Sequence, residues 1–308
     1  MDHISSHPLY KVHTIDSAMS SLWDFYRKHF LPLFATSFVM GLILQYLSTL
    51  VNITELQSLT DVNEIMAKLK DYIWPMLIVS LCGLLFTTML HYYVIYNPLD
   101  KESTIFRCLL KSLRYFIPYL IIVILLAFAG SVALFLGLLL LVIGILFAAI
   151  YIMTIFLFIL PAMMVEGPNI ANTISRSVTL AHRKFWSNIG WTAVFVIILL
   201  VATTILSGFI LLPFTGTFLK SFTNPEEATA LIEITTKPLY IILSAMLNAV
   251  TFPLLPIFAC ILYFNGRARE EIQTEPPVPT DYTDGKVRVE DLYAKPFSDE
   301  NEKKPEEN

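Results

Sequence analysis

The sequence predicts an all-α polytopic membrane protein with six transmembrane helices, and three observations lead to this fold class. Hydrophobic residues make up 56% of the chain and charged residues only 15%, whereas soluble domains average roughly 45–50% and about 25%. The apolar residues gather in runs of around 20, the length that crosses a hydrocarbon core about 30 Å thick. These runs also lack the polar face of a surface helix in a soluble protein.

The spans are expected at residues 30–51, 72–96, 117–138, 144–165, 189–212 and 238–264. The apolar segment 117–165 is too long for one crossing, so we predict a tight turn between Gly137 and Gly144 that divides it into two. Pro253 and Pro256 should bend the sixth span.

An amphipathic helix is predicted before the first, third and fifth spans. The first of these begins at Thr14, a good N-cap, and the second leads into a span that opens near Pro118. Each ends in basic and then aromatic residues: Arg27-Lys28-His29-Phe30, Leu113-Arg114-Tyr115-Phe116 and Arg183-Lys184-Phe185-Trp186. The pattern predicts three units, each a cytoplasmic amphipathic helix followed by a two-helix hairpin. The alternative is that any helix entering a membrane would carry such residues.

The distribution of positive charge predicts the orientation. Twelve Lys and Arg lie on the side of the amphipathic segments and only four on the other side, outside the C-terminal tail. By the positive-inside rule both termini are cytoplasmic, and the chain is a multi-pass protein of the cytoplasmic (inner) cell membrane.

The ends of the chain differ from its middle. We expect residues 1–13 to form a flexible N-terminus that lacks the apolar segment of a signal peptide. Residues 14–264 form the six-span membrane domain. Residues 265–308 are polar, acidic and proline-containing, which predicts a disordered cytoplasmic tail.

Short motifs near the ends of the fourth and sixth spans carry a resemblance to a known family. They are Pro161, Val165-Glu166-Gly167, Arg176-Ser177, Phe185-Trp186, and Leu262-Tyr263 followed by Arg267-Ala268-Arg269-Glu270. With them, residues 15–270 resemble the membrane domain of the glycerophosphoryl diester phosphodiesterase family and related uncharacterised bacterial six-span proteins. This chain has no soluble barrel domain to supply the metal-binding His and Glu residues of that enzyme. The resemblance therefore implies the membrane architecture and not the activity.

Glu166 is the most prominent single site residue. It is the only acidic residue between Glu102 and Glu226, and it stands where the fourth span ends. It could bind a cation or a headgroup amine, or pair with an arginine of a neighbouring amphipathic helix. The structural alternatives are capping of a helix that begins at Pro168, or an ion pair with Arg176. The sequence narrowly favours a structural role.

The basic residues of the amphipathic helices are candidates for binding anionic lipid headgroups. They are Arg27, Lys28, Arg107, Lys111, Arg114, Arg176, Arg183 and Lys184. Each would contribute about 1 kcal/mol beside an anionic leaflet, although setting the topology requires the same residues. Gln45 and Asn248 are the notable polar amides inside spans, where such residues usually hydrogen-bond a neighbouring helix.

Several function classes are disfavoured. No Asp, Glu, Lys or Arg lies at the centre of a span, so the charged relay of a proton pump or ion-coupled carrier is missing. The basic residues follow membrane boundaries, which argues against nucleic acid as a partner. We expect no metal site, no cofactor and no catalytic residue.

The leading hypothesis is a non-enzymatic integral membrane protein that acts as a scaffold, a lipid-responsive accessory subunit or a conduit. Its partners would be membrane lipids and other membrane proteins reached through the cytoplasmic tail. One alternative is a membrane transporter of a lipid or a small apolar or zwitterionic substrate, with a path along Gly130, Ser131, Ala133 and Gly137. Another is a membrane-embedded lipid-modifying enzyme that uses Glu166.

Overall fold

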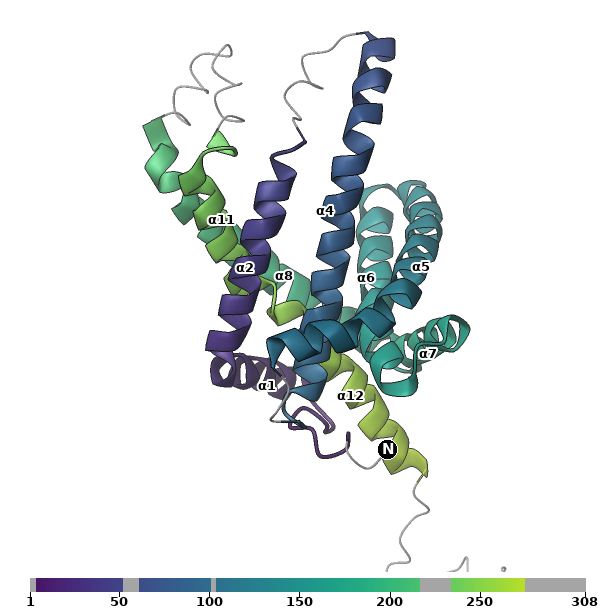
Figure 1. Ribbon diagram of the computed structural model, residues 1–308. Coiled ribbons are helices and arrows are strands. Elements are labelled where there is room, and N and C mark those ends of the chain that lie inside the picture. The colour runs from purple at the N-terminus through teal and green to yellow at the C-terminus, as the bar shows by residue number, and fades with distance from the viewer. Residues whose placement is uncertain (1–3, 52–60, 101–103, 217–233, 275–308) are drawn as a thin grey trace, which may run out of the picture. The chain divides into compact units, whose positions relative to one another are not determined.

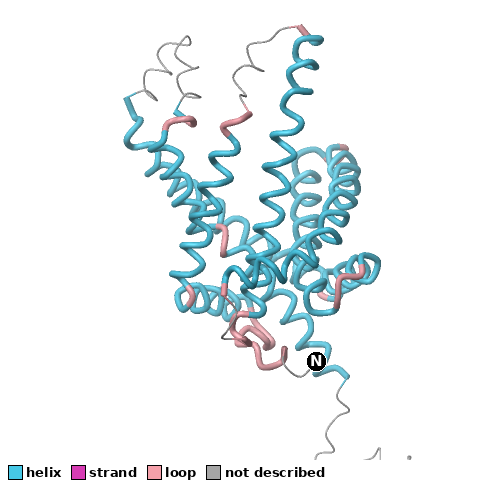
Figure 2. Tube along the Cα trace, viewed as in Figure 1, coloured by secondary structure: helices cyan, strands magenta, loops and turns pink. Residues whose placement is uncertain are grey.

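The computed structural model describes residues 4–51, 61–100, 104–216 and 234–274, and within these ranges the chain forms helices and short turns without strands (Figure 1 and Figure 2). The helices are α1 (Ile15–Lys28), α2 (Phe30–Ser48), α4 (Val62–Tyr96), α5 (Ile105–Leu138), α6 (Leu141–Glu166), α7 (Ile170–Arg183), α8 (Phe185–Leu211), the short η1 (Leu212–Phe214), α11 (Pro238–Thr251) and α12 (Leu254–Thr274). The chain divides into two compact units, Met1–Glu270 and Glu271–Asn308. The contacts below lie in the first unit.

Six helical stretches of the described part are long and apolar enough to cross a membrane, which confirms the predicted fold class. They are Phe30–Ser48, Val62–Tyr96, Ile105–Leu138, Val142–Glu166, Phe185–Phe214 and Pro238–Ile272. The second begins ten residues before its predicted start at residue 72, because the Asp61 side chain accepts the Asn63 N–H and caps α4 there. The turn between α5 and α6, at Leu139 and Leu140, lies between the two glycines as predicted.

Helices α1 and α7 lie across the same end of the bundle, and α5 crosses this end before it turns to run beside α6 (Figure 1). We call α1, the first part of α5 and α7 the transverse helices. In α1, Thr14 caps the N-terminus as predicted, with reciprocal hydrogen bonds to Ser17. Pro118, near which the third span is predicted to open, lies inside the continuous helix α5. A proline lacks the N–H donor and can kink a helix without ending it.

Glycines set the closest approaches between spans. A Cβ added at Gly137 on α5 would lie 2.7 Å from the carbonyl oxygen of Gly144 on α6, so these helices meet backbone to backbone beside their turn. A Cβ added at Gly41 on α2 would lie 3.2 Å from the backbone of Ala245 on α11. Thus α5 and α6 pack as a pair, whereas α2 packs closely on a helix from the other end of the sequence. The grouping of all spans into three hairpins stays a prediction.

Pro253 interrupts the last span, in agreement with the predicted bend. Helix α11 ends at Thr251 and α12 begins at Leu254, since proline removes one helical hydrogen bond and clashes with the preceding turn. The first half of α12 is the centre of the fold, because every residue from Ile257 to Phe264 is at most 1% exposed. This part of α12 is therefore packed by protein all round.

The prediction of a flexible N-terminus is wrong for residues 4–13, which pack against the bundle. His7 and His13 are at most 2% exposed. The His7 Nε2 atom lies 3.1 Å from the Val94 carbonyl oxygen, and the His13 N–H donates to Asn265 Oδ1 at 2.9 Å. The His7 ring thus pairs with a backbone carbonyl near the end of α4, and the His13 backbone N–H pairs with the Asn265 side chain, so the burial of this segment does not require an apolar sequence.

The predicted tail also begins too early. Helix α12 continues to Thr274 instead of ending at residue 264, because polar residues beyond Phe264 bond to neighbouring helices and to the N-terminal segment. Arg269 Nη2, for example, donates to the His13 carbonyl oxygen at 2.8 Å. The predicted disorder of residues 275–308 lies outside the described part of the chain.

Candidate functional site

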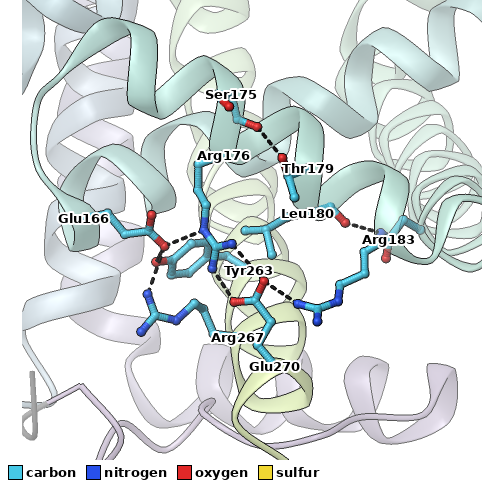
Figure 3. A network of polar contacts seen from close by, with 10 residues as sticks. Glu166, Ser175, Arg176, Thr179, Leu180, Arg183, Tyr263, Arg267 and Glu270 are labelled. Atoms are coloured by element: carbon cyan, nitrogen blue, oxygen red, sulfur yellow. Dashed lines mark hydrogen bonds and ion pairs between the residues drawn. The ribbon is translucent and has the colours of Figure 1, made fainter. Parts of the chain in front are cut away.

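Six polar residues from three helices meet at the end of the bundle that α7 crosses (Figure 3). They are Glu166 at the end of α6, Arg176 and Arg183 on α7, and Tyr263, Arg267 and Glu270 on α12. We call them the ion cluster. Its three arginines and two glutamates leave it with a net charge of +1 when all five are ionised.

One carboxylate oxygen of Glu166 collects three donors. Oε1 accepts from Arg176 Nε at 2.8 Å, from Arg267 Nη1 at 2.9 Å and from the Tyr263 hydroxyl at 2.9 Å. The Glu166 side chain is 27% exposed. Such charge-assisted bonds fix the orientation of the carboxylate. An oxygen engaged in this way is poorly placed to accept a proton from a substrate.

Arg176 joins this carboxylate to a second one. Its two Nη atoms donate to the two oxygens of Glu270 in a bidentate pair, with 2.8 Å between Nη1 and Oε1. Glu270 also forms an ion pair with Arg183. The hydrogen bonds that Arg176 donates to Glu270 and, with a smaller effect, to Glu166 raise the pKa of its guanidinium above the usual value despite partial burial. The arrangement therefore ties α6, α7 and α12 together through one guanidinium, which is always charged.

The alternative role of Glu166 as a helix cap is wrong. Helix α7 begins at Ile170, and its N-cap is Asn169, whose side-chain oxygen accepts the Asn172 N–H at 3.0 Å. Pro168 thus precedes the cap and does not occupy the first helical position. The chain reaches the cap through Gly167, whose φ of 112° strongly favours glycine.

The other predicted basic residues do not join the ion cluster. Arg27 and Lys28 end α1, and Lys184 follows α7. Arg107, Lys111 and Arg114 lie on the first part of α5. All six are exposed. Lys111 pairs with Asp100 at 3.9 Å, with both side chains at least half exposed.

Large apolar side chains stand uncovered beside these basic residues. On α5, Phe106 is 66% exposed, Leu110 53% and Leu113 45%, whereas the face turned to the protein carries the smaller Cys108 and Ser112. Trp23 on α1 is 53% exposed and Trp186 at the start of α8 is 74% exposed. These three apolar side chains of α5 therefore face away from the protein. We call these uncovered apolar residues, with the six exposed basic residues, the interfacial surface.

An apolar cavity of about 300 Å³ lies between α5, α6 and α7. Gly130 and Ala133, both predicted to line a substrate path, contribute to its wall, together with Ile174 on α7. Ser177 also lines it, and the buried Ser177 hydroxyl makes no hydrogen bond within the described residues. The other two residues of the predicted path, Ser131 and Gly137, do not line this cavity. Gly137 lies instead in the close contact with Gly144 on α6.

Gln45 and Asn248, the predicted intramembrane amides, line one cavity between α2, α8 and α11. They lie on helices that are far apart in the sequence, so the pairing could not be read from either residue alone. No group of three or more His, Cys, Asp or Glu residues in the described part of the chain is arranged to hold a metal ion.

The predictions missed the share of α12 in the ion cluster. Three α12 residues entered the predictions as part of a family motif but not as site residues: Tyr263, Arg267 and Glu270. Their spacing of four and three residues places them on one face of a helix. That spacing, in a segment assumed to be a tail, was the signal that could have identified them.

Comparison with known proteins gives no relative: no protein-family model, no curated protein and no solved structure matches this chain.

Proposed function

We propose that this chain is a non-enzymatic protein of the cytoplasmic membrane that binds anionic lipid with its transverse helices and acts as a lipid-responsive scaffold or accessory subunit. The observation that carries the proposal is the interfacial surface. Basic and large apolar side chains stand uncovered side by side on it. In water such a surface would be costly, whereas at a bilayer the apolar groups enter the acyl region and the basic groups meet headgroups.

The energies are large enough to matter. The three basic residues on the first part of α5 would contribute about 3 kcal/mol in total beside an anionic leaflet, at about 1 kcal/mol each. Burial of Phe106, Leu110 and Leu113 in the acyl boundary would add to this. Snorkelling allows long Lys and Arg side chains to reach headgroups while their stems stay in apolar surroundings.

The ion cluster could couple lipid binding at the transverse helices to the position of other helices. It joins α7, one of the transverse helices, to the end of α6 and to α12, whose first half is the centre of the fold. A shift of α7 at the membrane surface would therefore displace α12 through these ion pairs, and the C-terminal residues follow α12 in the chain. This coupling supports an accessory role better than a catalytic one, since the Glu166 oxygen is already engaged by three donors.

The test measures thermal unfolding of the purified protein in nanodiscs of phosphatidylcholine alone and of phosphatidylcholine with phosphatidylglycerol. The anionic lipid should raise the unfolding temperature of the natural chain. The triple variant R107Q/K111Q/R114Q should lose most of that rise. The matched control K68Q/K70Q removes two basic residues of α4 at the end of the bundle away from the transverse helices, and it should keep the rise. An equal rise in all three proteins would contradict the proposal.

A second candidate function is transport of a lipid or another apolar substrate, and the cavity between α5, α6 and α7 favours it. Its wall is apolar, and Gly130 and Ala133 leave room between the two spans. Filling this space with A133F should stop uptake of a fluorescent fatty acid by vesicles that contain the protein. Uptake that does not differ between A133F, the natural chain and protein-free vesicles would dismiss this candidate.

A further inference from the structure

The cavity between α2, α8 and α11 is lined by five polar side chains among the described residues, of which Ser207 is exposed and the other four are half-buried. Its volume is about 290 Å³, and it is bordered by Gln45 on α2, Ser207 on α8, and Tyr240, Ser244 and Asn248 on α11. Gln45 lies in the last turn of α2 and Tyr240 in the first turn of α11. The cavity therefore lies towards the end of the bundle opposite the transverse helices.

The two amides of this cavity, Gln45 and Asn248, are half-buried and have no hydrogen-bond partner among the described residues. An amide in apolar surroundings without a partner costs about 1–3 kcal/mol by protein mutational data, and within a bilayer the lipid tails cannot compensate it. Two such amides facing one space indicate that the space is filled by water or by a solute that bonds to them.

The chemistry of the lining selects the class of solute. The described side chains that border the cavity are amides, hydroxyls and apolar groups, and none of them is a carboxylate, ammonium or guanidinium. An ion placed there would lose its hydration without gaining a counter-charge. An apolar molecule would leave the amides and hydroxyls unsatisfied. A small neutral molecule that both donates and accepts hydrogen bonds satisfies both conditions.

We propose that this cavity is a hydrated binding site for a small uncharged polyol, with Gln45 and Asn248 as its recognition residues. An amide offers a carbonyl oxygen and an NH₂ group, so each can bond to one hydroxyl as donor and to another as acceptor. Ser207 and Ser244 add two further hydroxyls on neighbouring helices. The site is separate from the interfacial surface and from the ion cluster, and it does not depend on the proposed lipid response.

An apolar wall bounds the site. Ile210 on α8 and Leu247 on α11 line both this cavity and a second one of about 260 Å³, whose lining is almost entirely apolar. These two side chains therefore separate the polar space from the apolar one. A solute at the amides is therefore bounded on this side by apolar side chains.

The first experiment is saturation-transfer NMR on the full chain in nanodiscs, with glycerol, propionate and propylammonium as probes of similar size but different charge. Glycerol should receive saturation from the protein, and the two ions should receive much less. The double variant Q45L/N248L should reduce the glycerol signal at least fivefold while its unfolding temperature stays at or above that of the natural chain. A glycerol signal that is unchanged in the variant, or equal signals from all three probes, would overturn the proposal.

The second experiment tests hydration without any ligand. In a C82A background, S244C and A245C place single thiols on adjacent positions of α11, one lining the cavity and one fully buried. Only an ionised thiol in contact with water reacts rapidly with a methanethiosulfonate reagent. S244C should react, glycerol should slow that reaction, and A245C should stay unreactive. An unreactive S244C, or a reaction rate that glycerol does not change, would contradict the proposed site.

Discussion

Arg176 donates from its Nε atom to Glu166 Oε1 at 2.8 Å, and this bond fixes the transverse helix α7 to the last residue of the span α6. The same guanidinium holds Glu270 through its other two nitrogens. One side chain thus joins three helices at one end of the bundle, and the predictions that follow begin with its removal.

Replacing Arg176 should weaken the fold more than replacing an ordinary surface cation. The R176Q variant leaves two carboxylates that are only 27% and 19% exposed without their shared partner. We expect a loss of about 2 kcal/mol in the free energy of unfolding, between the values for exposed and for buried ion pairs. K111Q, which removes an exposed pair, should cost less than about 1 kcal/mol. Chemical unfolding in one detergent measures both, and equal losses would mean that the ion cluster is not structural.

Glu166 should be structural and not a site of chemistry or lipid recognition. The E166Q variant keeps the shape and one acceptor oxygen but removes the charge that attracts Arg176 and Arg267. We expect a lower unfolding temperature with unchanged retention of anionic lipid per folded molecule. A variant that folds as well as the natural chain but no longer retains lipid would assign Glu166 a direct binding role.

The contact between Gly137 on α5 and Gly144 on α6 should tolerate no side chain. In G144A the new methyl group would overlap the Gly137 carbonyl oxygen, and the strain should cost about 1–3 kcal/mol. G208A is the control, because an added Cβ there meets nothing within 4 Å and alanine favours a helix. Thermal unfolding of the two variants should therefore shift in opposite directions or leave G208A unchanged.

Acid should loosen the N-terminal segment through His7. Burial lowers the pKa of His7 from 6.5 to about 4, and the Leu9 N–H donates to Nδ1, so the folded state holds the neutral ring with its proton on Nε2. As the pH falls from 6.5 towards 4, the unfolded chain binds a proton that the folded chain does not, and stability decreases. Between pH 7 and pH 5 the loss should be about 2 kcal/mol.

The check is the free energy of unfolding at both pH values for the natural chain and for H7L. The variant should show a smaller decrease, with a remainder from His13, whose pKa is also lowered by burial. Above pH 6.5 neither protein should gain stability from these rings. A decrease of the same size in H7L would show that His7 does not control the acid sensitivity.

The proposed orientation predicts that the transverse helices and the C-terminus lie in the cytoplasm. A fluorescent reporter that matures only in the cytoplasm, fused after Asn308, should be bright. The same reporter placed in the predicted outer loop between α8 and α11 should be dark. The reverse pattern would invert the topology and would place the interfacial surface on the outer leaflet.

The number and the approximate position of the spans could be predicted because the length of an apolar run must match the thickness of the hydrocarbon core. The turn between Gly137 and Gly144 was found because no other breaker lies near the middle of that run. Thr14 and Pro253 were read correctly because capping and the loss of an N–H are local effects. Each of these predictions required only residues that are close in the chain.

The errors share a different cause. His7 can be buried because its ring nitrogens lie within hydrogen-bonding distance of the Leu9 N–H and of the Val94 carbonyl near the end of α4. Helix α12 continues past the predicted end of the last span because Arg267 and Glu270 bond within the ion cluster. In both cases the polar composition had favoured a flexible or disordered segment. Partners distant in the sequence supplied the missing bonds, and a single sequence does not reveal them.

Native mass spectrometry of the gently extracted protein tests the proposed lipid binding most directly. The natural chain, released from a membrane that contains phosphatidylglycerol and phosphatidylcholine in equal amounts, should retain mainly the anionic lipid. R107Q/K111Q/R114Q should retain less of it, and K68Q/K70Q should match the natural chain. Retention of both lipids in equal amounts, or of the same lipids by all three proteins, would contradict lipid recognition by the transverse helices.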